Sequence, residues 1–199
     1  MLTDTNNWIV RDPQISSRGA KSCQIEYALH PLHAPVGEDS KIRFNLGSKE
    51  LPTKTPFGAT TFNNEESAQK TIEFNITEDE DTMFHNVIDW IITHLTENSE
   101  RIFKKLMSRE QITDSFRSPI TRRTGYGPHI RCKIRPSNIR VWDAYGKIRE
   151  GGLPNDLRNY MLVPRMSIEK LWIMSRECGL VLQVCDLMIL EREEHACPF

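Results

Sequence analysis

The spacing of apolar residues changes along the chain, and this change constrains the fold more than any other feature. Apolar and polar residues alternate in residues 23–29, 41–46 and 71–76, as in strands that bury one face. From Glu78 to Leu106 the apolar residues follow helical spacing, with acids at the start and lysines near the end, as the helix dipole favours. Alternating or apolar segments return at 129–135, 139–142, 168–176 and 179–190. The sequence therefore predicts a mainly β (α+β) fold with one helical insertion.

The helical insertion is predicted over about residues 79–116. Asn98-Ser99 is typical of a break, and Ser108 to Gln111 has the pattern of a capping box that opens a short helix ending near Phe116. The last segment, Gly179 to Leu190, is apolar at nearly every position, which predicts a central strand covered on both faces.

No internal repeat or second core is evident, so we expect a single domain over residues 21–190. A flexible segment is predicted over residues 1–20, with Trp8–Val10 as an edge strand in the alternative interpretation. Residues 191–199 are predicted to form an acidic C-terminal tail.

Positive charge is concentrated in one part of a chain whose net charge is −1. Residues 101–149 contain 13 Lys and Arg against 3 acids, while the rest of the chain contains 13 basic residues against 24 acids. The aromatic residues interleaved with these charges are Phe103, Phe116, Tyr126, Trp142 and Tyr145. Basic side chains neutralise phosphates and exposed rings stack on unpaired bases, so this segment predicts a polyanionic partner. The alternative is a solvated basic face whose aromatic residues belong to the core.

Residues 129–142 are interpreted as a hairpin that sorts its side chains by face. Ile130, Cys132 and Ile134 point one way and the intervening cations the other, because successive strand residues alternate. Across the turn, Ile139 and Val141 continue the apolar face. We hypothesise that Trp142 stacks a base on the basic face, where cations neutralise phosphates. In the alternative, Trp142 folds over the mouth of a barrel and the cations only increase solubility.

Loops at 118–128 and 144–158 extend the predicted site on either side of this segment, unless they are disordered linkers. The predicted nucleic-acid-binding residues are Arg122, Arg123, Tyr126, Arg131, Lys133, Arg135, Arg140, Trp142, Tyr145, Lys147 and Arg149.

The sequence contains no motif for a nucleotide-binding loop, a nucleophile elbow, a zinc protease or a zinc deaminase. The five cysteines are widely spaced and none forms a pair with zinc-finger spacing, and the His30/His33 and His195/Cys197 pairs offer two ligands each. We therefore predict no catalytic residue, no metal and no cofactor, with a metal-dependent nuclease as an alternative. Without a membrane-spanning run or a secretory signal, and with cysteines read as reduced thiols, an intracellular location is expected.

The order of the elements resembles the OB-fold single-stranded DNA-binding proteins of large eukaryotic DNA viruses, of the African swine fever virus type. The resemblance covers about residues 40–190. It is carried by Ile42–Asn45, Glu73–Ile76, the amphipathic helix, Ile130–Ile134 and Cys178–Gln183. It implies an OB-like β-barrel with a helix between barrel strands, which binds single strands through basic and aromatic side chains.

The chain's end is similar to the tails of bacterial single-stranded DNA-binding proteins, which are acidic and finish in Pro-Phe. Glu191, Glu193 and Glu194 precede Cys197-Pro198-Phe199, although Arg192 and His195 interrupt the acidic run. This similarity implies a protein partner at the C-terminal tail.

The sequence thus predicts a sequence-nonspecific single-stranded DNA-binding protein, without enzymatic activity, that acts in DNA replication, recombination or repair. RNA is the alternative ligand, and no membrane partner is expected. A second hypothesis is a virion or chromatin component whose basic segment binds an acidic partner.

Overall fold

The computed structural model describes residues 5–28, 40–60 and 69–192 and is mainly β with three helices. The helices are α1 Glu78–Glu97, α2 Ser99–Phe103 and α3 Arg109–Ser115, preceded near the start of the chain by a 3-10 turn, η1 Thr5–Asn7. The strands are β1 Trp8–Val10, β2 Gln14–Ile15, β3 Lys21–Cys23, β4 Ile25–Tyr27, β5 Arg43–Asn45, β6 Ala59–Thr60, β7 Lys70–Asn75, β8 Phe116–Arg117, β9 Ile120–Arg122, β10 Pro128–Ile134, β11 Arg140–Trp142, β12 Tyr160–Ile173 and β13 Cys178–Arg192. The predicted class, mainly β with a helical insertion, is confirmed.

The chain divides into two compact units, each built from three segments of sequence. Unit 1 comprises Met1–Phe44, Glu78–Ile120 and Ser167–Leu182, and unit 2 comprises Asn45–Thr77, Thr121–Met166 and Gln183–Phe199. The long strands β12 and β13 contribute residues to both units. The single OB-like domain over residues 21–190 stays a prediction.

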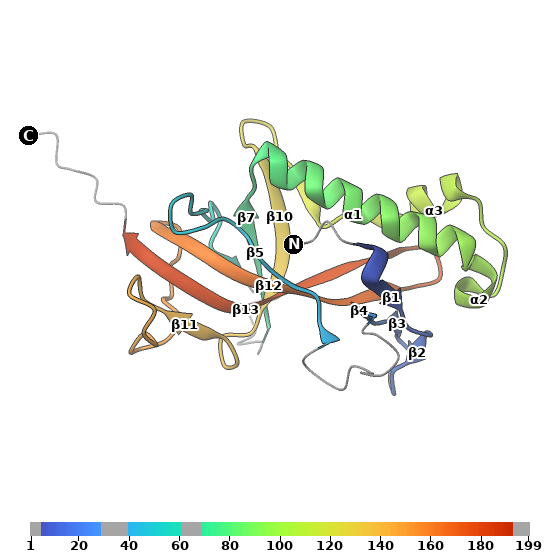
Figure 1. Cartoon of the computed structure of the whole chain (residues 1–199), viewed down its shortest axis with the longest axis horizontal. Coiled ribbons are helices and arrows are strands. Elements are labelled where there is room, and N and C mark those ends of the chain that lie inside the picture. The colour runs from blue at the N-terminus through green and yellow to red at the C-terminus, as the bar shows by residue number, and fades with distance from the viewer. Residues whose placement is uncertain (1–4, 29–39, 61–68, 193–199) are drawn as a thin grey trace, which may run out of the picture. The chain divides into compact units, whose positions relative to one another are not determined.

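Unit 1 holds the three described helices, which are drawn in Figure 1. Helix α1 buries the apolar stripe that the spacing predicted. The buried residues of α1 are Phe84, Val87, Ile88, Ile91, Ile92 and Leu95. Phe84 meets Phe44 of β5 edge to face, with ring centroids 5.5 Å apart. In this unit β3 pairs antiparallel with both β2 and β12, and β8 runs parallel to the start of β13.

The helical region breaks where the sequence indicates. Asn98 lies between α1 and α2, and Ser108 caps α3. The Ser108 hydroxyl accepts a hydrogen bond from the Gln111 backbone N–H, and the Ser108 N–H donates to the Gln111 side chain, which confirms the capping box. Arg109 then ties α3 to α1 by an ion pair to Asp89.

We expect Ser108→Ala to lower the free energy of unfolding by about 1 kcal/mol, because the first turn of α3 loses its side-chain cap. Urea unfolding of the wild type and the variant measures this difference. Ser17→Ala, at an exposed turn position, is the control and should leave the midpoint unchanged. Equal midpoints for Ser108→Ala and the wild type would contradict the role assigned to the cap.

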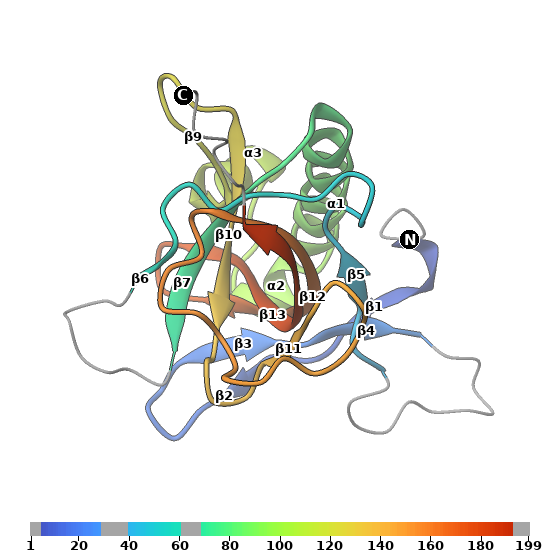
Figure 2. The ribbon, with the colours of Figure 1, turned by 90° about the vertical axis from the view of Figure 1, so that its left-hand side faces the viewer.

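Unit 2 is organised around the antiparallel pair β7–β10, which Figure 2 shows side by side. The register runs from His129 opposite Asn75 to Ile134 opposite Lys70. β6 continues the sheet beyond β7, β9 pairs with β10, and the second half of β13 runs parallel to β10 and β11. Ile130, Cys132 and Ile134 are buried while Arg131 is exposed, which confirms the predicted faces of this strand.

The predicted hairpin over residues 129–142 is wrong. β10 and β11 do not pair with each other; both run parallel to β13, at Lys133↔Gln183 and at Arg140↔Asp186. The chain between them closes a tight turn in which the Arg135 carbonyl accepts hydrogen bonds from the N–H groups of Asn138 and Ile139. Because both strands keep the same direction along β13, this turn shifts the chain along its neighbour instead of reversing it.

The two ends of the chain bear on further predictions. Trp8–Val10 forms the edge strand of the alternative interpretation: β1 pairs with β4, and Trp8 and Val10 are buried. Most of the predicted acidic tail, residues 193–199, lies outside the described residues. None of the described helices is long and apolar enough to cross a membrane.

Candidate nucleic-acid interface

A buried carboxylate lies between two arginines on the β7–β10 pair. Arg131 is directly opposite Glu73 in the register, and its guanidinium donates to the Glu73 carboxylate at 3.0 Å. Arg123, in the connection between β9 and β10, donates to the same carboxylate at 3.2 and 3.3 Å. Glu73 is only 6% exposed, whereas about half of each arginine side chain is exposed (48% and 51%). Glu73 therefore fixes two guanidinium groups side by side at the surface, with a net charge of +1.

Three rings gather beside these arginines. The Arg123 guanidinium lies 4.4 Å from the centroid of the Phe57 ring. The ring centroid of Phe57 is 5.5 Å from that of Tyr126 and 5.6 Å from that of His129. His129 is buried and Phe57 half-buried, but Tyr126 is 56% exposed. These contacts thus leave the Tyr126 ring exposed and the Arg123 side chain half-exposed at the surface.

More cations flank this pair of strands. Lys133 is opposite Thr71 and donates to its hydroxyl at 2.9 Å, which places its ammonium on the same face as Arg131. Arg122 ends β9 with an exposed side chain, and Arg135 is half-buried just after β10. We call Phe57, Glu73, Arg123, Tyr126 and Arg131 the Glu73 cluster.

A second buried carboxylate organises β11. Asp186 of β13 is 7% exposed, accepts a hydrogen bond from Arg140 Nη2 at 3.1 Å and forms an ion pair with Arg140 Nε at 2.7 Å. The same carboxylate accepts the indole N–H of Trp142 at 3.1 Å. The Arg140 guanidinium lies 5.9 Å from the centroid of the half-buried indole. We call Arg140, Trp142 and Asp186 the Asp186 cluster.

The turn after β11 carries the last predicted site residues. The Asp143 carboxylate accepts hydrogen bonds from the N–H groups of Tyr145 and Lys147, and Gly146 takes a positive φ of 78° that closes the turn. Tyr145 is 87% exposed at the tip. Arg149 is half-buried and donates to the Gly152 carbonyl. This turn is held by its own hydrogen bonds, so Tyr145 and Lys147 are presented on a defined backbone.

Among the described residues, the exposed aromatic rings lie in this basic segment. Of the aromatic residues in the three described stretches, only Tyr126 and Tyr145 are exposed; the others are buried or half-buried. Both come from unit 2 and from the segment with 13 Lys and Arg against 3 acids. A large ring left in water costs free energy that a packed position would recover, so its retention at a basic surface favours a stacking partner.

The structure thus brings together Arg123, Tyr126, Arg131 and Lys133 in one group and Arg140 with Trp142 in another. Within the described residues, the structure shows no hydrogen bond, ion pair or ring contact between the two groups, so one continuous platform stays a prediction.

Sequence reasoning missed four residues that build these groups: Phe57, Glu73, His129 and Asp186. Of these four, only Asp186 could have been singled out from the sequence, because it is the single charged residue within the apolar run 179–190.

Burial raises the thiol pKa of two cysteines in the described residues. Cys132 of β10 is buried, and its burial raises the pKa of its thiol, with the nearby Glu73 carboxylate adding to the effect. Burial likewise raises the pKa of the Cys178 thiol to about 11 in unit 1. Within residues 5–28, 40–60 and 69–192, no three His, Cys, Asp or Glu side chains are grouped so that they could hold a metal ion.

No protein-family model matches the chain, and no curated protein matches its sequence. Among solved structures, the fold is similar to that of gp2.5, a single-stranded DNA-binding protein encoded by bacteriophage T7. The similarity has a TM-score of 0.49 at 16% identity, and covers 77% of this chain and 88% of the phage protein. The narrower resemblance to proteins of large eukaryotic DNA viruses stays a prediction. At this identity the similarity concerns the fold alone.

Proposed function

We propose that the protein binds single-stranded DNA without sequence preference, through the Glu73 cluster, Trp142 and the neighbouring cations of unit 2. Phosphates would lie against the half-exposed guanidinium groups, and unpaired bases would stack on the exposed rings. This role would serve DNA replication, recombination or repair, and RNA is the alternative ligand.

The observation that carries the proposal is that one exposed ring, Tyr126, lies in the same cluster as the half-exposed Arg123 and Arg131. A guanidinium has five N–H donors, and Arg123 and Arg131 use only some of these donors in hydrogen bonds to Glu73. The remaining donors can meet a phosphate without breaking the ion pair. Because Glu73 already holds both side chains in place, little rotamer entropy would be lost on binding.

A titration of labelled oligo(dT) followed by fluorescence anisotropy, over a series of salt concentrations, tests the proposal. We expect binding that weakens linearly with the logarithm of the salt concentration, and weaker binding to duplex DNA of the same length. Oligo(dT), oligo(dA) and an RNA of mixed sequence should bind with similar affinities, because stacking and phosphate contacts do not read base edges. Failure to bind oligo(dT) at low salt would refute the proposal.

The second candidate is an interaction protein whose basic segment meets an acidic protein. The positive charge of residues 101–149 supports an acidic protein partner as well as it supports DNA. The exposed rings favour DNA, because they offer faces on which bases can stack. Poly-glutamate in place of oligo(dT) separates the two: an acidic protein partner predicts that poly-glutamate binds as tightly as DNA, whereas stacking predicts much weaker binding.

We expect Tyr145→Ala to weaken oligo(dT) binding by about 1 kcal/mol, at the low end for a stacked base. The ring is exposed at the tip of a turn, so ordering it on binding offsets part of the stacking energy. Anisotropy titrations measure the change. Ile148→Ala removes an exposed apolar side chain of the same turn and should leave the affinity unchanged. Equal losses in both variants would mean that the turn, and not the ring, supports binding.

A further inference from the structure

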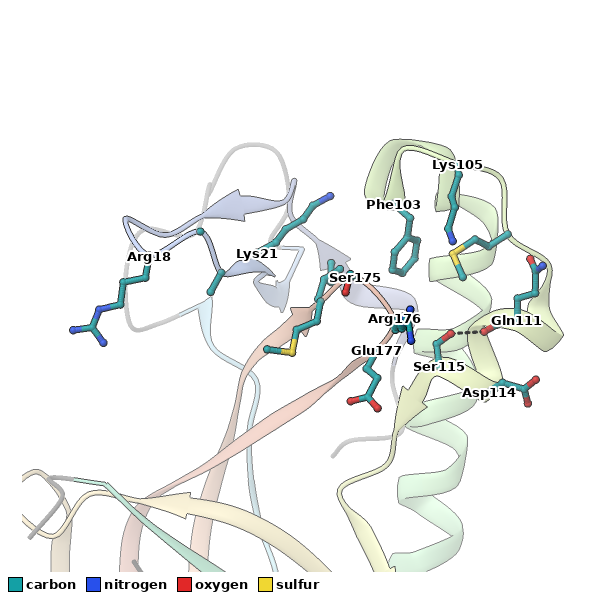
Figure 3. Close-up of a pocket in the computed structure, with 15 residues that line it drawn as sticks. Arg18, Lys21, Phe103, Lys105, Gln111, Asp114, Ser115, Ser175, Arg176 and Glu177 are labelled. Atoms are coloured by element: carbon teal, nitrogen blue, oxygen red, sulfur yellow. Dashed lines mark hydrogen bonds between the residues drawn. The ribbon is translucent and has the colours of Figure 1, made fainter. Parts of the chain in front are cut away.

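Unit 1 contains a cavity that is separate from the residues of the proposed DNA site. Its volume is about 940 Å³, and its walls come from the β2–β3 turn, the end of α2, α3 and the β12–β13 turn (Figure 3). All of these segments belong to unit 1.

Part of the cavity lining is apolar. Phe103, Met107 and Ile173 line it, together with Met174, which is 66% exposed. Figure 3 shows the Phe103 ring pointing from the end of α2 into the space beside the turn that carries Ser175 and Arg176. Thioether side chains adapt their shape to irregular apolar partners, so this lining suits aliphatic or aromatic side chains. No exposed ring lines the cavity, so it has no platform for stacking bases.

The charged part of the lining, which we call the rim, is mostly basic. Its cations are Arg18, Lys21, Lys105 and Arg176, and its acids are Asp114 and Glu177. The Glu177 charge is already matched, because its carboxylate accepts a hydrogen bond from Arg117 at 2.5 Å and this ion pair lowers the pKa of Glu177. The remaining excess of positive charge makes the rim complementary to an anionic partner.

The walls are held by their own contacts, so the cavity does not depend on a ligand to form. Lys21 of β3 donates through its ammonium to the Ile102 carbonyl at the end of α2. The Met107 N–H donates to the hydroxyl of the buried Ser99, and the Met174 N–H donates to the Glu177 carbonyl across the β12–β13 turn. Such a preformed site loses little conformational entropy on binding.

From the apolar lining and the basic rim together, we infer that this cavity docks an acidic peptide segment of a partner protein. Its aliphatic or aromatic side chains would enter beside Phe103 and Met174, and its carboxylates would meet Lys105 and Arg176. The inference does not rest on DNA binding, which is assigned to other residues in unit 2.

The probe is a fluorescein-labelled peptide in which glutamates alternate with leucine and phenylalanine. A second peptide carries serine in place of every apolar residue. We expect the full-length protein to bind the first peptide, and Lys105→Glu to weaken that binding by roughly threefold to tenfold. Lys170→Glu is the matched control: it makes the same charge change at an exposed position of β12 in the same unit, outside the cavity, and should have no effect.

Methionine methyl signals in NMR spectra locate the bound peptide. Met107 and Met174 should shift on titration, while Met166, buried against Cys132 in unit 2, should not. Three outcomes would overturn the inference. The serine peptide could bind as tightly as the first peptide, Lys105→Glu and Lys170→Glu could have equal effects, or the first peptide could fail to bind. It would also be overturned if Lys105→Glu weakened oligo(dT) binding instead, since the cavity would then belong to a nucleic-acid surface. If the wild type bound the peptide but not oligo(dT), only the proposed function would be refuted, and the inference about the cavity would stand.

Discussion

Replacing Arg123 and Arg131 together by alanine should reduce single-stranded DNA binding more than any other change in the basic segment. Each guanidinium is half-exposed and fixed by Glu73, so each is placed to meet one phosphate. Losing two such contacts should lower the affinity by about 2–4 kcal/mol at low salt. The slope of log affinity against log salt should become shallower by about 1.4, which is the share of two phosphates on a single strand.

The same double substitution should also destabilise the fold. It leaves the Glu73 carboxylate, 6% exposed in the wild type, without its two cationic partners. We expect a loss of about 1–3 kcal/mol, moderated because water can reach the space that the arginine side chains vacate. Loss of binding in this variant alone could therefore reflect partial unfolding.

A triple variant separates the two effects. Adding Glu73→Gln to Arg123→Ala and Arg131→Ala removes the uncompensated charge, so urea unfolding should return close to the wild-type value. Oligo(dT) binding should stay as weak as in the double variant. If the triple variant bound DNA like the wild type, the Glu73 cluster would have no part in the interface.

Local features of the fold could be predicted from the sequence because they depend on neighbours along the chain. The capping box at Ser108, the break at Asn98 and the apolar stripe of α1 involve residues within one or two helical turns of each other. The alternating faces of β10 follow from strand geometry alone. These are the predictions that the structure confirms.

Strand partners could not be predicted in the same way, because they depend on contacts between distant segments. The turn at Arg135–Ile139 has the composition of a hairpin turn, yet β11 finds its partner in β13, 46 residues away at Arg140 and Asp186. Periodicity gives the face of a residue but not its neighbour across the sheet.

The same limit explains the two buried carboxylates. Glu73 lies on the polar face of an alternating strand, so nothing along the chain indicates that it is buried. Its burial follows from Arg131 opposite it and Arg123 beside it, 58 and 50 residues away. Sequence patterns predicted the cations of the proposed site but not the acids that hold them in place.

Trp142→Ala should weaken oligo(dT) binding by about 1–3 kcal/mol, the range for loss of one aromatic stacking partner. The indole is half-buried, and its N–H is held by Asp186, so the orientation of the ring is fixed before DNA arrives. A fixed ring loses little entropy on stacking, and for this reason we expect a larger effect here than at Tyr145.

The structure also predicts that Trp142→Ala keeps its fold. Asp186 retains its hydrogen bond and ion pair with Arg140 when the indole is removed, so the buried carboxylate stays paired. Thermal unfolding followed by circular dichroism checks this, and anisotropy on the same samples measures binding. Trp142→Phe is the control that keeps an aromatic face while losing the N–H and part of the ring area, and it should retain most of the affinity. A folded Trp142→Ala variant that binds oligo(dT) like the wild type would show that this indole serves the packing of β11 against β13 and not the binding of bases.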